Sequence, residues 1–274
     1  MSRSDRGRRA AGIAGVALLL IVACAAAPRR VGGDPYQTDL EARLRPPTAA
    51  HVLGQDALGR DVLARLLHGA RVSLAVGGSA VALSLLLGTL LGAAAGYRGD
   101  WFDEVLARLI DVLLAFPGLL LVIGLVAVLG PSLRNVVLAL SLLGWTGYAR
   151  LVRTEVATLR QREFVDAARA LGASPWRIVV RHLLPLAAPA LLVQATFGLS
   201  SAIVAEASLS FLGLGATPPT PSWGAMLDEG RAFLLIAPHL TLAPGAAIAA
   251  TVLALQLLGD GLRDWLDVRD GPPL

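Results

Sequence analysis

The sequence predicts an all-α membrane protein with six transmembrane helices and both termini in the cytoplasm. Only 16% of its 274 residues are charged and 55% are hydrophobic, whereas a soluble domain carries about 25% charged residues. Six apolar stretches are each close to the length that a helix needs to cross a bilayer. All 24 basic residues are arginines, and they flank these stretches without forming a basic stripe. The positive charge therefore indicates that the protein interacts with a lipid bilayer and not with a nucleic acid.

The first apolar stretch, residues 11–27, follows four arginines and has the minimal length of a membrane span. A cleaved signal peptide is the alternative, and the Ile-Val-Ala-Cys sequence that ends at Cys24 resembles a lipoprotein cleavage site. We expect a retained span, because more spans follow. Residues 1–72 then form one unit, the N-terminal span with its extracytoplasmic connection.

The connection, residues 28–72, is polar and rich in Pro, Asp and Arg. It ends in a pattern typical of an amphipathic helix that leads into the next span. The apolar face of this helix comprises Leu58, Val62, Leu66 and Ala70. Four nearby side chains are of types that bind metals, namely His51, Asp56, Asp61 and His68. Their spacing matches no standard metal site, so we expect solvated surface charges and no metal ligands.

Five further apolar stretches follow in residues 73–270, which we expect to form the core domain. They are residues 73–95, 105–129, 135–154, 187–206 and 240–258. Small residues recur in several of them, as in Gly88 and Gly92, which lie four residues apart. This spacing favours close packing between helices in lipid.

The arginine distribution sets the predicted orientation through the positive-inside rule. With the N-terminus inside, seven arginines lie on the inner side between residues 150 and 181. The outer 28–72 connection also holds seven, which nearby acidic residues partly offset. Residues 211–238, before the last span, mix apolar side chains with Gly and Pro. We expect them to form an outer cap that is too irregular for a helix.

Few ionisable residues lie at membrane depth, where each is a candidate for function. Asp111 follows Arg108 by three residues, and we expect these two to pair on one helix. Glu206 is a candidate to line a path across the membrane, although a structural hydrogen-bonding role is the favoured interpretation. The spans show no proton-relay chain, no nucleophile–base pair and no phosphate-binding GxxxxGK[ST] pattern. The sequence therefore favours neither an ion-coupled transporter nor an enzyme.

The segment from Glu163 to Pro189 is the most polar part of the second half of the chain. Two short helical patterns meet in it at Gly172, a residue that readily ends a helix in a left-handed conformation. Ser174 and Pro175 then restart a helix as its N-cap and first residue. The result is a compact helix–turn–helix that carries several arginines. Two small residues, Ala167 and Ala168, would let another surface approach it closely.

This segment resembles the EAA loop of ABC importer permeases, which reads E-A-A, three residues, G, nine residues and I-x-L-P. The matching residues are Asp166, Ala167, Ala168, Gly172, Leu184 and Pro185. Two positions differ, because Asp166 replaces the glutamate and His182 replaces the isoleucine. The aspartate keeps the charge, whereas His182 is a less conservative replacement in the second short helix.

The resemblance covers the chain from about His51 to Arg269. HVLGQDALGRDVLARLLHGARVSL, YARLVR, EASLSFLGLG, PTPSWG and LLGDGLRDWLD are similar to the C-type permease subunits of dipeptide, oligopeptide and nickel importers. It implies the type I ABC importer permease fold and a cytoplasmic coupling loop at about residues 155–186. The docking residues that it implies are Arg162, Asp166, Ala167, Ala168, Arg169, Gly172, Leu184 and Pro185.

The same resemblance implies several partners. They are a homologous second permease, two cytoplasmic ATPase subunits and an extracytoplasmic substrate-binding protein, all at the cell membrane. ATP and Mg would be used by the ATPases, and this chain would bind no cofactor itself. Peptides are the expected solute. Nickel or a nickel chelate is the alternative, because LRQREFV resembles that subgroup, and an ion-coupled secondary transporter is a weaker one.

Overall fold

The computed structural model describes residues 12, 15 and 33–267, so nearly all of the predicted first span lies outside the described residues. Regular structure in the described part is helical. Its elements are η1 (Leu40–Ala42), α3 (Val62–Arg98), α4 (Trp101–Leu114), α5 (Gly118–Leu129), α6 (Leu133–Leu159), α7 (Glu163–Ala170), α8 (Pro175–Ile178), the π-helix η2 (Val179–Leu183), α9 (Leu184–Phe211), α10 (Trp223–Arg231) and α11 (His239–Asp267).

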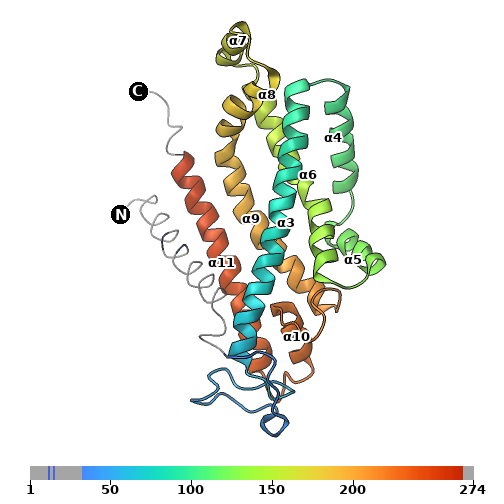
Figure 1. The fold of residues 1–274 in the computed structure, drawn as a ribbon, viewed down its shortest axis with the longest axis vertical. Helices are drawn as coiled ribbons and strands as arrows, with labels where there is room; N and C mark the ends of the chain where they lie inside the picture. The colour runs from blue at the N-terminus through green and yellow to red at the C-terminus, as the bar shows by residue number, and fades with distance from the viewer. Residues whose placement is uncertain (1–11, 13–14, 16–32, 268–274) are drawn as a thin grey trace.

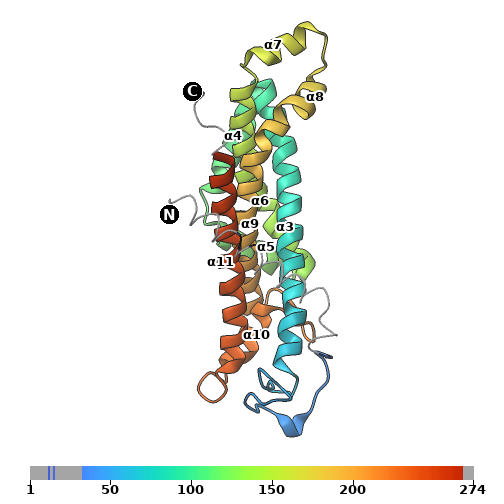
Figure 2. The same cartoon turned by 90° about the vertical axis from the view of Figure 1, so that its left-hand side faces the viewer.

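The long helices run side by side in a bundle (Figure 1). α3, α6 and α11 run in one direction, and α4 and α9 run in the other. α7 and α8 lie beyond one end of this bundle, as Figure 2 also shows, while α10 and residues 33–61 lie at the opposite end. We call the α7–α8 end the inner end and the α10 end the outer end, in keeping with the predicted orientation.

Four single helices of the described part are long and apolar enough to cross a membrane. They are Val62–Arg98, Leu133–Leu159, Pro175–Phe211 and His239–Leu266. The pair α4–α5 passes the same test but is bent by 86°, so it is either a broken fifth span or a re-entrant loop. These five segments overlap the five spans predicted for residues 73–270, although α3 begins earlier than predicted, at Val62.

The prediction of one continuous span over residues 105–129 is wrong in its shape. α4 ends at Leu114, and α5 restarts after Pro117. Proline lacks an N–H, and it disfavours a helical conformation in the residue before it, so Phe116 cannot continue α4. The Phe-Pro-Gly sequence therefore breaks the span, and α5 lies across the bundle (Figure 1).

Glycines let α3 and α6 approach until their backbones touch. A Cβ at Gly88 would lie 2.6 Å from the Trp145 carbonyl oxygen, and one at Gly92 would lie 2.5 Å from that of Ala149. The spacing of four residues keeps both glycines on one helix face. The predicted packing role of the Gly88–Gly92 pattern is thus confirmed.

Replacing Gly92 with isoleucine is expected to destabilise the protein by about 1–3 kcal/mol, because the branched side chain would force α3 away from α6. Thermal unfolding of the detergent-solubilised protein measures this loss. Gly78→Ile is the matched control on the same helix, since a Cβ at Gly78 meets no atom within 4 Å. Equal unfolding temperatures for the two variants would contradict the packing account.

Two predictions for the outer end are corrected. Residues 51–61 form turns and no amphipathic helix, since α3 begins only at Val62. The Asp61 side chain caps α3 by accepting a hydrogen bond of 2.7 Å from the Ala64 N–H. The cap at residues 211–238 contains a helix, α10, which begins after the N-cap Ser222. A good N-cap thus starts a helix in a segment that appeared too rich in Gly and Pro.

Candidate functional site

The turn between α7 and α8 has the geometry that the sequence predicts. Gly172 is left-handed, with φ of 78°. Its N–H donates to the Arg169 carbonyl at 2.9 Å, and the Ala173 N–H donates to that of Ala168 at 3.0 Å. These two bonds form a Schellman motif, which satisfies carbonyls at the end of α7.

α8 starts as predicted and continues into α9 through a π-helical turn. The Ser174 hydroxyl caps α8, with Pro175 in the first turn. The π-helix Val179–Leu183 follows, and the Leu184 N–H bonds the Val179 carbonyl five residues back. Pro185 cannot donate to this ladder and would crowd a carbonyl four residues earlier, so the wider turn accommodates it. His182 lies in this turn with an exposed side chain.

An apolar cluster fixes the helix–turn–helix to the bundle. Val165 of α7 and Ile178 of α8 are both fully buried. They pack with Ala93 of α3 and with Val152 and Val156 of α6. Any push on α7 or α8 is therefore transmitted to two long helices through packed side chains.

The eight predicted docking residues gather at the inner end, around this helix–turn–helix. Those that are exposed are Arg162, Asp166, Ala167, Arg169, Gly172 and Pro185. Ala168 and Leu184 are half-buried, and both pack against the apolar cluster. Ala168 thus contributes to the internal packing of the segment, whereas Ala167 faces outward.

Large apolar side chains accompany the polar ones on this surface. Leu171 is 88% exposed and Trp176 is 68% exposed, in the turn and at the start of α8. Arg169 lies 3.0 Å from Asp166 and stacks over the Tyr97 ring at 5.7 Å, which ties α7 to the end of α3. Exposed aromatic and apolar groups beside ordered charges are typical of a protein–protein interface.

Gly172→Pro is expected to disrupt the α7–α8 turn while leaving the spans in place. Proline fixes φ near −65° and removes the N–H that bonds the Arg169 carbonyl, so the native turn is inaccessible. Limited proteolysis of the purified protein should show faster cleavage near residue 172. Gly172→Asn is the control, because asparagine tolerates the left-handed region. Equal protection of both variants would contradict a role for this conformation.

Glu206 lies far from these residues, at the outer half of α9, and its side chain is fully buried. The Ser210 hydroxyl donates to its Oε1 at 2.7 Å. The Ser73 and Ser222 side chains approach the same carboxyl group, but Oε2 has no hydrogen-bond partner among the described residues. Its hydroxyl contacts fit the structural role, while a role in a membrane path stays a prediction.

A cavity of about 390 Å³ lies in the middle of the bundle, between α3, α5, α6 and α9. Its polar lining consists of Ser84, Tyr148, Gln194 and Ser201. Tyr148 is 4% exposed, and its hydroxyl has no hydrogen-bond partner among the described residues. The sequence interpretation missed these groups, although a glutamine and a tyrosine within apolar spans are the signal that could have found them.

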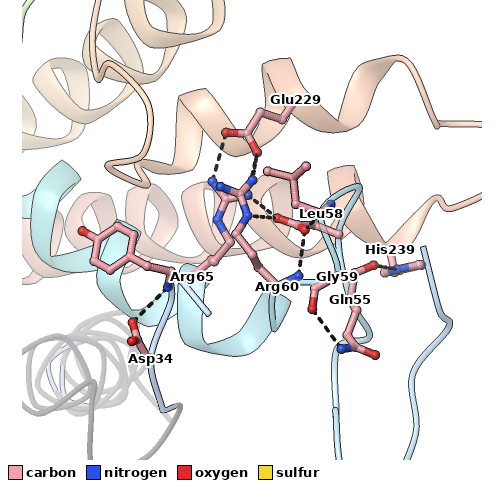
Figure 3. Close-up of polar contacts among 10 residues, drawn as sticks. Asp34, Gln55, Leu58, Gly59, Arg60, Arg65, Glu229 and His239 are labelled. Carbon is pink, nitrogen blue, oxygen red and sulfur yellow. Dashed lines mark hydrogen bonds and ion pairs between the residues drawn. The ribbon is translucent and has the colours of Figure 1, made fainter. Parts of the chain in front are cut away.

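The outer end contains a second cluster that the sequence interpretation missed (Figure 3). The buried Arg65 donates to Asp56 at 2.6 Å and to Glu229 at 2.5 Å. Arg60 also bonds both carboxylates, at 2.7 Å and 2.8 Å. The cluster joins the outer connection, α3 and α10. The partners are up to 169 residues apart, so no local pattern could indicate them.

The expectation of solvated charges at residues 51–68 is wrong for Asp56, which is 5% exposed. Burial alone would raise the pKa of Asp56, but the Arg60 N–H and the Arg65 guanidinium together hold this pKa below its usual value. His51 bonds the Asp61 carboxylate at 2.7 Å. Within the described ranges, no three His, Cys, Asp or Glu side chains gather as metal ligands. These carboxylates instead pair with arginine or histidine.

The predicted ion pair between Asp111 and Arg108 is not formed, and each of the two residues pairs with another partner. Arg108 bonds Glu104 on α4, whereas Asp111 bonds Arg150 of α6 at 2.7 Å. Asp103 and Arg153 make a second bond between the same helices, with Nη2 2.8 Å from Oδ2. These contacts hold α4 against α6 near both ends of α4, so the expected intrahelical pairing of Asp111 with Arg108 is wrong.

The helical bundle, with its polar helix–turn–helix at one end, defines a multi-pass membrane protein. Residues 88–269 match the family described as "Binding-protein-dependent transport system inner membrane component". This chain belongs to that family, whose members are the permease subunits of ABC importers.

Curated relatives and solved structures agree with this assignment. The chain is 48% identical to the glutathione transport system permease protein GsiD of Pectobacterium atrosepticum, over 81% of this chain and 73% of that protein. It is 45% identical to the dipeptide transport system permease protein DppC of Alkalihalophilus pseudofirmus, over 88% of this chain and 79% of that protein. An inward-facing structure of the MetNI methionine ABC transporter matches with a TM-score of 0.57 at 19% identity, covering 76% of this chain and 96% of that one. This structural likeness shows the fold alone.

Proposed function

We propose that this permease moves dipeptides or oligopeptides inward across the cytoplasmic membrane, driven by ATP hydrolysis in separate ATPase subunits. The observation that carries the proposal is the exposed helix–turn–helix, fixed to α3 and α6 through its own buried residues. The peptide substrate is supported by relatives named for glutathione and dipeptide transport, at 48% and 45% identity. They favour peptides over the nickel alternative.

The helix–turn–helix docks on an ATPase in this proposal. Leu171, Trp176 and Ala167 supply the contact area, while Asp166 and Arg169 orient it. Because Val165 and Ile178 are packed between α3 and α6, closure of the ATPases tilts these spans and alternates access to the path. ATP and Mg are held by the ATPases, and the permease performs no covalent chemistry.

The proposal also includes two further partners. A homologous second permease completes the path, and an extracytoplasmic binding protein delivers the solute at the outer end. The outer cap carries α10 and residues 33–61, which the Arg65 cluster holds together. A rigid outer surface of this kind suits repeated docking of a loaded binding protein.

Competition tests the substrate class. Vesicles that contain the complete transporter are expected to accumulate a labelled dipeptide in the presence of its binding protein. An excess of unlabelled dipeptide should suppress this uptake, whereas an excess of nickel(II) should not. Nickel uptake that dipeptides leave unchanged would contradict the peptide assignment and support the alternative.

A further inference from the structure

The central cavity contains a polar group that the bundle itself leaves unpaired. Gln194 lines this cavity from α9, and its side chain is exposed. The Tyr148 hydroxyl, which lacks a partner among the described residues, lies against the backbone of Gly198, where a Cβ would overlap it. The buried Tyr148 hydroxyl costs free energy at membrane depth, because no water or lipid headgroup replaces its missing bond. A ligand that enters the cavity and hydrogen-bonds the hydroxyl would offset this cost.

The lining indicates the chemistry of such a ligand. Every residue that lines the cavity is uncharged at neutral pH, and most are apolar, such as Leu119, Val122 and Phe197. A charged group would lack a counter-ion there. The Gln194 amide offers both a donor and an acceptor, which is the same pair that a peptide group presents. The volume of about 390 Å³ lies in the range of small-molecule sites.

We propose that this cavity is a subsite of the translocation path that binds the peptide group of the solute, through the Gln194 amide and the Tyr148 hydroxyl. This inference rests on the proposed function. α5 closes the side of the cavity at Gly118 and Leu119, since the break at Pro117 turns it across the bundle. Gln194 and Ser201 are exposed, so the cavity is open on their side, and the charged ends of a short peptide point out through this opening while its amide faces Gln194.

A methylated substrate isolates the contribution of this hydrogen bond. Uptake into vesicles with the complete transporter is measured for a labelled dipeptide and for its analogue methylated on the peptide nitrogen. The binding protein is saturated with each, so that the maximal rates compare passage through the permease. Gln194→Leu should slow the unmethylated dipeptide about three- to tenfold, which is the effect of one lost hydrogen bond. It should also reduce the preference for that dipeptide over its analogue.

Two further variants separate recognition from packing. Gln256→Leu is the matched control, because Gln256 is exposed on α11 and does not line the cavity. This variant should keep the wild-type uptake rate and the wild-type preference for the unmethylated dipeptide. Tyr148→Phe retains the buried ring and removes only the hydroxyl, so it should change the preference in the same direction without loss of assembled transporter.

The inference is overturned if Gln194→Leu and Tyr148→Phe keep the wild-type preference, whether their rates are normal or lowered equally for both substrates. An equal loss would mean that the polar groups serve packing or contact the second permease. Failure of the proposed function gives a different result, because the wild-type transporter would then accumulate neither the dipeptide nor its methylated analogue.

Discussion

Ala167→Arg is expected to abolish ATP-driven uptake while the permease still inserts into the membrane. Ala167 is exposed on α7, and its small side chain allows a second surface to approach the helix backbone. An arginine at this position would bury an unpaired charge in the contact, which costs about 3–5 kcal/mol. Such a cost weakens ATPase association at least a hundredfold. Co-purification of the ATPase with the tagged permease measures the loss.

The choice of Ala167 follows from the geometry of α7. Ala168 is half-buried and packs on the apolar cluster, so an arginine there would disturb the segment itself. Ala49→Arg is the matched control, since Ala49 is exposed and belongs to the segment 33–61, which lies at the outer end. If Ala167→Arg retained the ATPase as fully as Ala49→Arg does, the docking role of α7 would be refuted.

Arg65→Met is expected to destabilise the outer end by about 3–5 kcal/mol. Its side chain is 2% exposed and pairs with Asp56 and with Glu229, which is 35% exposed, so its removal leaves the buried Asp56 carboxylate without part of its compensation. Arg71→Met, on an exposed position of the same helix, should change the free energy of unfolding by less than about 0.5 kcal/mol. Thermal unfolding of the two purified variants compares these effects.

A second substitution tests whether the loss comes from the unpaired charge. Adding Glu229→Leu to Arg65→Met leaves the Asp56–Arg60 pair and places two apolar side chains together. This double variant should recover at least half of the lost stability. No recovery would show that the arginine stabilises the outer end mainly by packing its alkyl stem.

The same cluster gives the protein a stability that depends on pH. The pKa of Asp56 is lower in the folded protein than in the unfolded chain. Its contribution is therefore complete above the unfolded pKa, near pH 4, and is lost as the pH falls through the lower folded pKa. Unfolding temperatures measured between pH 6 and pH 3 should fall less steeply for Asp56→Asn than for the wild type. Parallel curves would contradict the pairing.

Local signals in the sequence predicted much of the bundle and of the docking segment. Apolar length located the five described spans, and the residues Gly172, Ser174 and Pro175 predicted the turn between α7 and α8. These features depend on neighbouring residues, so they can be identified without knowledge of the fold. The Phe-Pro-Gly break at Pro117 was equally local, and it was missed because the apolar run on both sides suggested a single span.

The remaining features depend on contacts between distant segments. Arg65 meets Glu229 only after α10 folds back on α3, and Asp111 meets Arg150 only when α4 packs against α6. Tyr148 and Gln194 lie on different helices, and only the packed bundle places them around one cavity. Composition and spacing carry no information about these pairings, so the outer cluster and the cavity could not be predicted in this way.

Uptake of a labelled dipeptide into sealed vesicles tests the central claim most directly. The vesicles contain this permease with its second permease, both ATPases and the binding protein, and the ATP supply on the ATPase side is varied. Accumulation is expected with ATP and Mg, and it should cease when ATP is removed or when Ala167→Arg replaces the wild-type permease. Peptide uptake that continues unchanged without ATP would contradict the account.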